Sequence, residues 1–76
     1  MEEKIVIKTA YITLGQALKE AAIIDSGGQA KWFLDDVPVF INDESEAETR
    51  RGRKLYPGDS VTVEDEAAFY IVADEG

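Results

Sequence analysis

Four basic side chains lie within five consecutive residues of this sequence: Arg50, Arg51, Arg53 and Lys54. A guanidinium presents a planar fork of donors that matches phosphate oxygens, so such a run predicts a phosphate-binding surface. Gly52 stands within the run, and a glycine permits positive φ and close approach of the backbone to a ligand. The alternative is a solvated polar turn that keeps a small sheet soluble.

The charge balance of the whole chain is opposite in sign to this run. The 76 residues contain 16 acidic and 8 basic side chains, for a net charge of −8. An evenly spread negative charge would repel nucleic acid. However, half of the basic residues lie at positions 50–54, and electrostatic screening reaches about 8 Å at physiological salt. The segregation of charge therefore favours the binding surface over the solvated turn.

A second candidate site is the start of a predicted helix at Gly27-Gly28-Gln29. The first N–H groups of a helix have no intrahelical partner and attract anions, and two glycines leave room for a phosphate. The sequence lacks the Gly-Lys-Ser/Thr ending of a P-loop. The alternative is a plain helix start in which the glycines serve a tight turn.

Lys31 and Trp32 follow directly and extend this candidate. Trp32 lies about 200° around the helix from Ala30, so we expect it to be exposed and able to stack on a base. The alternative is that Trp32 packs over the terminal strands as peripheral core. Lys31 is suited to phosphate, although Asp35 lies four residues later and can pair with it.

The sequence lacks the residue types that several kinds of catalytic and metal site require. Cysteine and histidine are both absent, which removes disulfides, zinc sites and the usual nucleophile–base pair. The acidic residues at 35–36 and 43–48 do not fit a calcium loop, so we interpret them as solvated carboxylates. We expect no catalytic residue, metal or cofactor, and therefore a binding module and not an enzyme. The sequence shows no membrane-spanning or signal segment, which favours the cytoplasm and no membrane partner.

The elements that must position these residues form a single domain, residues 1–76. A β-branched stretch at 4–8 predicts a strand. Thr13 can cap a helix whose apolar stripe is Leu14, Ala17, Leu18, Ala21 and Ala22. A second helix begins at Asp25 or Ser26 and runs to about residue 36, with Ala30, Phe33, Leu34 and Val37 at helical spacing.

Strands dominate the second half of the sequence. Alternation at 37–42 predicts a strand, and residues 46–51 are interpreted as its returning partner in a hairpin. Tyr56-Pro57-Gly58-Asp59 predicts a type II turn, followed by strands at 60–64 and 68–73. The expected order is β-α-α-β-β-β-β, an α+β fold with the helix pair packed on a small antiparallel sheet.

Three blocks of this sequence, in order, resemble the S4 RNA-binding domain family. They are residues 25–31 (DSGGQAK), 39–42 (VFIN) and 49–59 (TRRGRKLYPGD). The chain is most similar to the short stand-alone bacterial S4-like proteins of the YaaA type in Gram-positive bacteria. The resemblance covers roughly residues 4 to 72.

The resemblance implies an S4-like fold that binds structured RNA through its second helix and a following basic hairpin. Lys31 matches a basic position on that helix, and Ser26 the residue that opens it. Arg50, Arg51, Arg53 and Lys54 match the basic stretch. Ribosomal RNA is the leading candidate, with tRNA next and a ribosome-associated protein as a further partner.

Two other classes remain open. A ubiquitin-like sulfur carrier shares the Asn-containing strand end and the late Gly-Asp turn, but acts through a terminal Gly-Gly, whereas this chain ends in Glu75-Gly76. A protein-interaction accessory of the ribosome or replication machinery would use the acidic surface. The basic run alone also fits a nuclear-import signal, which conflicts with the bacterial resemblance.

Overall fold

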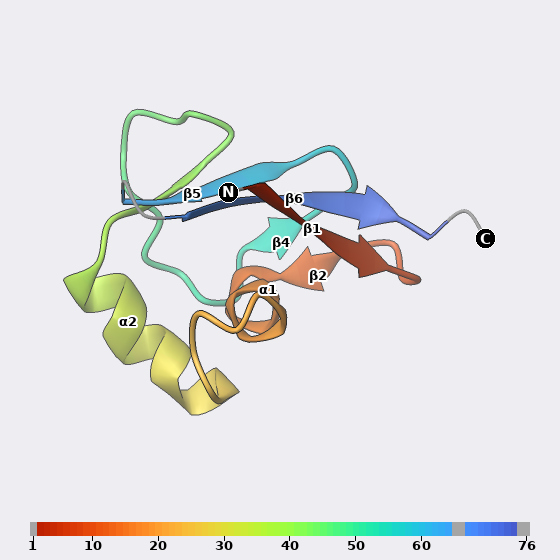
Figure 1. Cartoon of the computed structure of the whole chain (residues 1–76). Helices are drawn as coiled ribbons and strands as arrows, with labels where there is room; N and C mark the ends of the chain where they lie inside the picture. The colour runs from red at the N-terminus through yellow and green to blue at the C-terminus, as the bar shows by residue number, and fades with distance from the viewer. Residues whose placement is uncertain (1, 65–66, 75–76) are drawn as a thin grey trace.

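The computed structural model describes residues 2–64 and 67–74 and contains two sheets and two α-helices (Figure 1). The terminal Glu75-Gly76, on which the carrier alternative depends, lies outside the described residues. The elements, in chain order, are β1 (Glu2–Ile7), β2 (Ile12–Thr13), α1 (Leu14–Glu20), the 3₁₀ turn η1 (Gly27–Gln29), α2 (Ala30–Asp36), β3 (Val39–Ile41), β4 (Lys54–Leu55), β5 (Ser60–Val63) and β6 (Ala67–Ala73).

The main sheet has four strands in the order β1-β6-β5-β3. β3, β5 and β6 are antiparallel neighbours, whereas β1 runs parallel to β6, from Glu2 beside Ala68 to Ile7 beside Ala73. The expected α+β fold is confirmed, but the expectation of a purely antiparallel sheet is wrong in this respect. The reason is that almost the whole domain separates β1 from β6, a connection long enough to cross over and return in the same direction.

A second, two-stranded sheet pairs β2 with β4, and the sequence did not indicate it. The predicted returning strand at 46–51 is wrong: these residues form a loop, and β3 pairs with β5 instead. Within residues 46–51, the N–H of Glu48 reaches β3, where it donates to the carbonyl of Val39 at 2.7 Å. The loop between β3 and β4 is shaped by side-chain hydrogen bonds, which alternation of residue types does not reveal.

The first helix begins as predicted at Thr13. The Thr13 side chain caps the N–H of Gln16 and the Gln16 side chain returns to the N–H of Thr13, a reciprocal capping box. Leu14, Ala17 and Leu18 are buried, which confirms most of the predicted stripe. Ala22 does not belong to it, since α1 ends at Glu20 and Ala22 is exposed with a left-handed φ of 61°.

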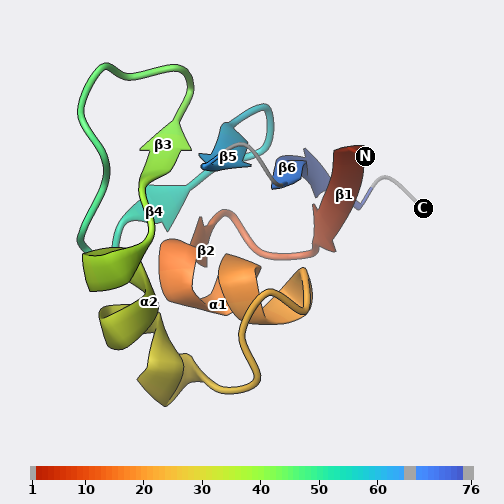
Figure 2. The same ribbon diagram turned by 60° about the vertical axis from the view of Figure 1, so that its left-hand side comes forward.

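The second helix also begins near its predicted position, with Ser26 preceding η1 and α2 continuing to Asp36. Both helices lie on one side of the main sheet (Figure 2), and η1 continues directly into α2. The predicted type II turn is confirmed, because Gly58 has a φ of 100° and the N–H of Asp59 donates to the carbonyl of Tyr56 at 2.9 Å.

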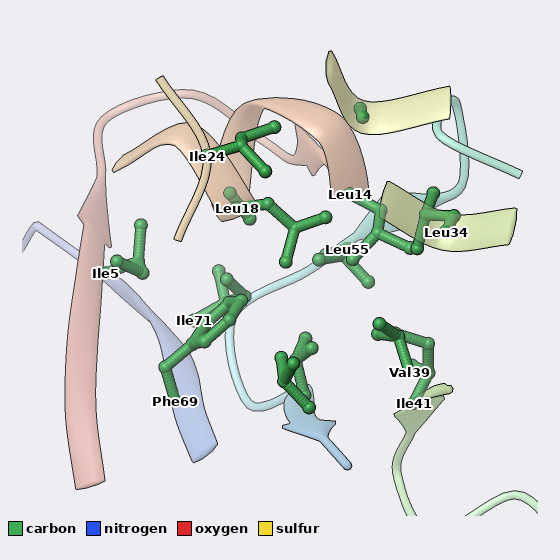
Figure 3. Packing of buried hydrophobic residues seen from close by; sticks show 14 of the residues in the cluster. Ile5, Leu14, Leu18, Ile24, Leu34, Val39, Ile41, Leu55, Phe69 and Ile71 are labelled. Atoms are coloured by element: carbon green, nitrogen blue, oxygen red, sulfur yellow. The ribbon is translucent and has the colours of Figure 1, made fainter. Parts of the chain in front are cut away.

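The hydrophobic core fills the space between the sheet and the helices (Figure 3). Its largest fully buried side chains come from several elements: Phe69 and Ile71 from β6, Leu14 and Leu18 from α1, and Leu55 from β4. Leu55 therefore anchors the end of the basic run to the core. Within residues 2–64 and 67–74, no helix has the length and apolar character needed to cross a membrane.

Candidate nucleic-acid interface

The basic run lies at the end of the loop between β3 and β4 and is attached to the start of α1. The N–H of Leu14 donates to the carbonyl of Arg53 at 2.8 Å, and the N–H of Gly15 donates to the carbonyl of Arg51 at 2.9 Å. Both donors belong to the first turn of α1, where N–H groups have no partner within the helix. The loop therefore completes the hydrogen bonding of α1, and α1 fixes the backbone from which the basic side chains project.

Gly15 is the point at which both helices and the basic run converge. A Cβ added at this glycine would lie 3.3 Å from Cβ of Ala30 and 3.4 Å from the carbonyl oxygen of Arg51. A larger side chain would separate α2 from the run. Sequence reasoning missed this role, although a glycine inside an otherwise apolar helical stripe was the available signal.

Arg53 directs its donors at two carboxylates. Its Nη1 donates to Glu48 at 2.8 Å and to Glu44 at 3.1 Å, and its Nη2 donates to the second oxygen of Glu44 at 2.9 Å. Arg50 adds hydrogen bonds of 3.2 Å from Nε and Nη2 to Glu48, whose carboxylate also accepts from the N–H groups of Thr49 and Arg50. These four residues, Glu44, Glu48, Arg50 and Arg53, form an Arg–Glu cluster.

The electrostatics of this cluster follow from its hydrogen bonds. Those from Arg50 and Arg53 lower the pKa of Glu48 to about 2, against the opposing effect of burial. Hydrogen bonding to Arg53 also lowers the pKa of Glu44, and the two carboxylates raise the pKa of Arg53. The interpretation of Glu48 as a solvated carboxylate is therefore wrong, because it is buried and paired, a contact between residues that the sequence did not connect.

The cluster divides the four cations of the run into two groups. Arg53 is mostly covered and serves the loop, whereas Arg51 and Lys54 are exposed and, among the described residues, form no ion pair. Arg50 contacts Glu48 but keeps 73% of its side chain exposed. The arrangement presents Arg50, Arg51 and Lys54 to solvent on a fixed backbone.

A shallow hollow of about 520 Å³ lies at this surface, lined by Arg50, Gly52, Arg53 and Lys54. Gly52 does not adopt a positive φ, since Gly58 is the glycine that does so in the described part of the chain. Its contribution is steric, because a Cβ at this position would meet no atom within 4 Å and the backbone is open to a ligand. The hollow can admit a phosphate group between basic side chains.

The second candidate site has a different local chemistry. The Gln29 side chain accepts from the N–H groups of Asp25 and Ser26 at 2.6 and 3.2 Å, so it organises the turn before the helix. Gly27, Gly28 and Lys31 are exposed, and Lys31 forms no ion pair with Asp35. Lys31 follows Ala30, the residue of α2 that packs against Gly15.

Trp32 is 74% exposed, which confirms the predicted exposure and excludes the alternative of peripheral core. A hollow of about 470 Å³ beside it is lined by apolar side chains of the α1–α2 connection and α2, and by three polar ones: Ile23, Ile24, Trp32, Phe33, Val37, Asp25, Gln29 and Asp36. The carboxylates at its edge make this surface less suited to phosphate than the basic run.

The arrangement of a two-helix unit, a mixed sheet and a basic loop on the first helix is that of an S4-type domain. Comparison of sequences agrees: the model of the S4 domain family matches residues 5–72, and the chain belongs to this family. It is 53% identical over 72 residues to the probable ribosome maturation protein RlbA of Bacillus subtilis (strain 168), spanning 95% of this chain and 99% of that protein. No solved structure matches. The resemblance to stand-alone bacterial S4-like proteins is thus confirmed.

Proposed function

We propose that this protein is an RNA-binding module of ribosome maturation that recognises structured RNA in the cytoplasm, with ribosomal RNA as its target. Its membership of the S4 family and its 53% sequence identity to RlbA, a probable ribosome maturation protein of Bacillus subtilis, support this role. It acts by binding and positioning and not by catalysis, since the surface consists of cations and backbone groups without a nucleophile–base pair.

The observation that carries the proposal is the attachment of the basic run to the start of α1. Two backbone hydrogen bonds and the Arg–Glu cluster fix the loop before any ligand arrives. A loop backbone that is fixed in advance loses little conformational freedom on binding, so more of each phosphate contact contributes to affinity. In this arrangement Arg51, Lys54 and Arg50 contact phosphates, whereas Arg53 holds the loop.

The start of the second helix extends this surface across the Gly15 junction. Lys31 adds an exposed cation, and the exposed backbone of Gly27 and Gly28, shaped by Gln29, allows close approach of the RNA. Trp32 offers an exposed ring on the same helix. The proposed RNA-binding surface therefore consists of the basic run and the start of the second helix, and the basic run supplies most of its positive charge.

Binding of the double variant Arg51→Ala/Lys54→Ala to fluorescently labelled ribosomal RNA, over a series of salt concentrations, tests the proposal. We expect the affinity to fall at least tenfold and the slope of log K against log salt to become shallower by about 1.4–1.8, as for two lost phosphate contacts. The matched control is Lys4→Ala/Lys19→Ala, which removes the same charge from exposed positions elsewhere. Unchanged binding by a folded Arg51→Ala/Lys54→Ala protein would overturn the assignment.

A ribosome-associated protein is the second candidate partner, favoured by the apolar, acid-edged hollow beside Trp32. Such a surface suits a basic segment with an apolar side chain, a common feature of proteins that themselves bind RNA. Purification from cells with and without nuclease treatment separates the two candidates. Loss of all ribosomal components after nuclease supports the RNA, and retention of a protein partner supports the second candidate.

A further inference from the structure

Two exposed tyrosines and a lysine meet where the basic run ends. We propose that Tyr11, Tyr56 and Lys54 form a binding site for one unpaired nucleobase and its phosphate. This inference rests on the proposed RNA-binding function and adds to it the feature recognised, a base outside a helix.

The small sheet formed by β2 and β4 creates this site. Ile12 pairs with Leu55 and Thr13 with Lys54, so the same antiparallel register places Tyr11 opposite Tyr56. Successive side chains of a strand point to opposite faces. Leu55 points into the core and Ile12 is partly buried, and Tyr11, Lys54 and Tyr56 therefore share the outer face.

The rings lie close together but do not cover each other. Their centroids are 5.9 Å apart with an angle of 52° between the planes, and the two residues remain 40% and 48% exposed. Nζ of Lys54 lies over the Tyr11 ring, 4.9 Å from its centroid. Lys54 thus occupies one face of Tyr11, and the ring of Tyr56 is the surface on which a base can stack.

Hydrogen bonds hold the backbone at both tyrosines in place. The N–H of Tyr56 donates to the Asp59 carboxylate at 2.8 Å, and the second oxygen of Asp59 accepts from the Asn42 amide at 3.0 Å. On the other strand the Thr9 hydroxyl donates to the carbonyl of Tyr11 at 2.7 Å. Because the backbone on both sides is ordered before a ligand arrives, less entropy is lost when the rings contact one.

The chemistry of the site selects an unpaired base. Base–aromatic stacking needs an open base face, which a base within a duplex does not offer. Lys54 belongs both to this face and to the hollow of the basic run, so a phosphate held there lies next to the base on Tyr56. The competing explanation is that the tyrosines form only a cross-strand packing pair that stabilises the small sheet.

Fluorescence of 2-aminopurine distinguishes these explanations. The probes are a single-stranded RNA oligonucleotide containing one 2-aminopurine and a blunt duplex of the same sequence. Binding of the native protein should quench the single-stranded probe. Tyr56→Leu, which keeps an apolar side chain without a ring, should weaken single-strand binding about 5- to 100-fold and leave duplex binding within twofold. Tyr56→Phe, which keeps an aromatic ring, should bind the single-stranded and the duplex probe as the native protein does.

Equal binding of the single strand by native protein and a folded Tyr56→Leu variant would overturn the site. An equal loss of affinity for the single-stranded and the duplex probe would overturn it too. If Tyr56→Leu does not fold, photocross-linking of the native protein to 4-thiouridine RNA replaces it: cross-links at Tyr56 or Tyr11 support the site, and cross-links confined to other residues overturn it. Salt-sensitive binding without quenching rejects the nucleobase site alone, whereas absence of binding to either probe or to ribosomal RNA rejects the proposed function as well.

Discussion

Nη1 of Arg53 donates a 2.8 Å hydrogen bond to Oε1 of Glu48, a side chain that is only 7% exposed. The basic run therefore contains its own counter-charge, supplied by the preceding part of the same loop. Half-buried ion pairs of this kind are costly to break, because the remaining partner is left without its hydrogen bonds. The same contact holds the loop in the conformation from which the exposed cations project into solvent.

Replacement of Glu48 by Gln should destabilise the protein and change its response to acid. Glu48 has an ordinary pKa of 4.5 and a folded-state pKa of about 2. A lowered pKa means that the folded protein favours the ionised form, which contributes about 3 kcal/mol above pH 4.5 and progressively less as the pH falls toward 2. We expect Glu48→Gln to lose about 2–3 kcal/mol of the free energy of unfolding at pH 7. The stability of this variant should also fall less than that of the native protein as the pH is lowered.

Denaturant unfolding at pH 7, 4 and 3 measures both effects. Glu46→Gln is the matched control, since Glu46 is an exposed glutamate of the same loop that forms no ion pair within the described residues. The two variants should differ clearly at pH 7 and by roughly half as much at pH 3, because the contribution of Glu48 is lost fully only near its folded-state pKa of about 2. Equal stability of both variants at pH 7 would contradict the role assigned to Glu48.

The outcome at Glu48 illustrates what sequence patterns can and cannot give. The capping by Thr13, the turn at Gly58 and the exposure of Trp32 depend on neighbours within four residues, and each was predicted. The pairing of Arg53 with Glu44 depends on how a loop folds back over nine residues, and no periodicity encodes it. Parallel pairing of β1 with β6 likewise joins the two ends of the domain, so local patterns cannot reveal it.

The location of the candidate site was predicted from the sequence, but the separate roles of its residues were not. The run at 50–54 was found because charge stands out against an acidic chain. Arg51 and Arg53 look equivalent in sequence, yet one is exposed and the other is directed at two carboxylates. Tyr11 lies more than 40 residues from Tyr56, and only the register of β2 and β4 brings the two rings together.

Substitution of Gly15 by Leu should disturb both helices and the basic run together. Its Cβ alone would lie 3.3 Å from Ala30, and the rest of the side chain must displace α2 or the backbone of Arg51. We expect a loss of about 1–3 kcal/mol and weaker RNA binding although no charge changes. Gly27→Leu is the size-matched control for stability, since a Cβ there meets nothing within 4 Å and the change should cost less than about 1 kcal/mol. Similar unfolding of the two variants would show that the junction is not tightly packed.

Trp32 is the sole tryptophan of the chain and reports directly on its own surroundings. Because the indole is 74% exposed, its emission should be quenched readily by acrylamide, and Trp32→Ala should change stability by less than about 0.5 kcal/mol. Addition of ribosomal RNA should protect the emission from acrylamide if the second helix contacts RNA as proposed. Unaltered quenching at saturating RNA would remove Trp32 from the RNA-binding surface and leave it for a protein partner.

Arg53→Lys separates the charge of Arg53 from its geometry. Lysine keeps the positive charge but cannot direct two groups of donors at Glu44 and Glu48 at once. We expect a loss of about 1.5–3 kcal/mol in the free energy of unfolding, the size of a hydrogen bond to a charged group. The salt slope of RNA binding should stay unchanged, because Arg53 contributes no phosphate contact of its own.

Arg51→Lys provides the comparison: it should leave stability within about 0.5 kcal/mol, since Arg51 is exposed and outside the Arg–Glu cluster. A reversed result, with stability lost at Arg51 and the salt slope reduced at Arg53, would exchange the roles of the two arginines.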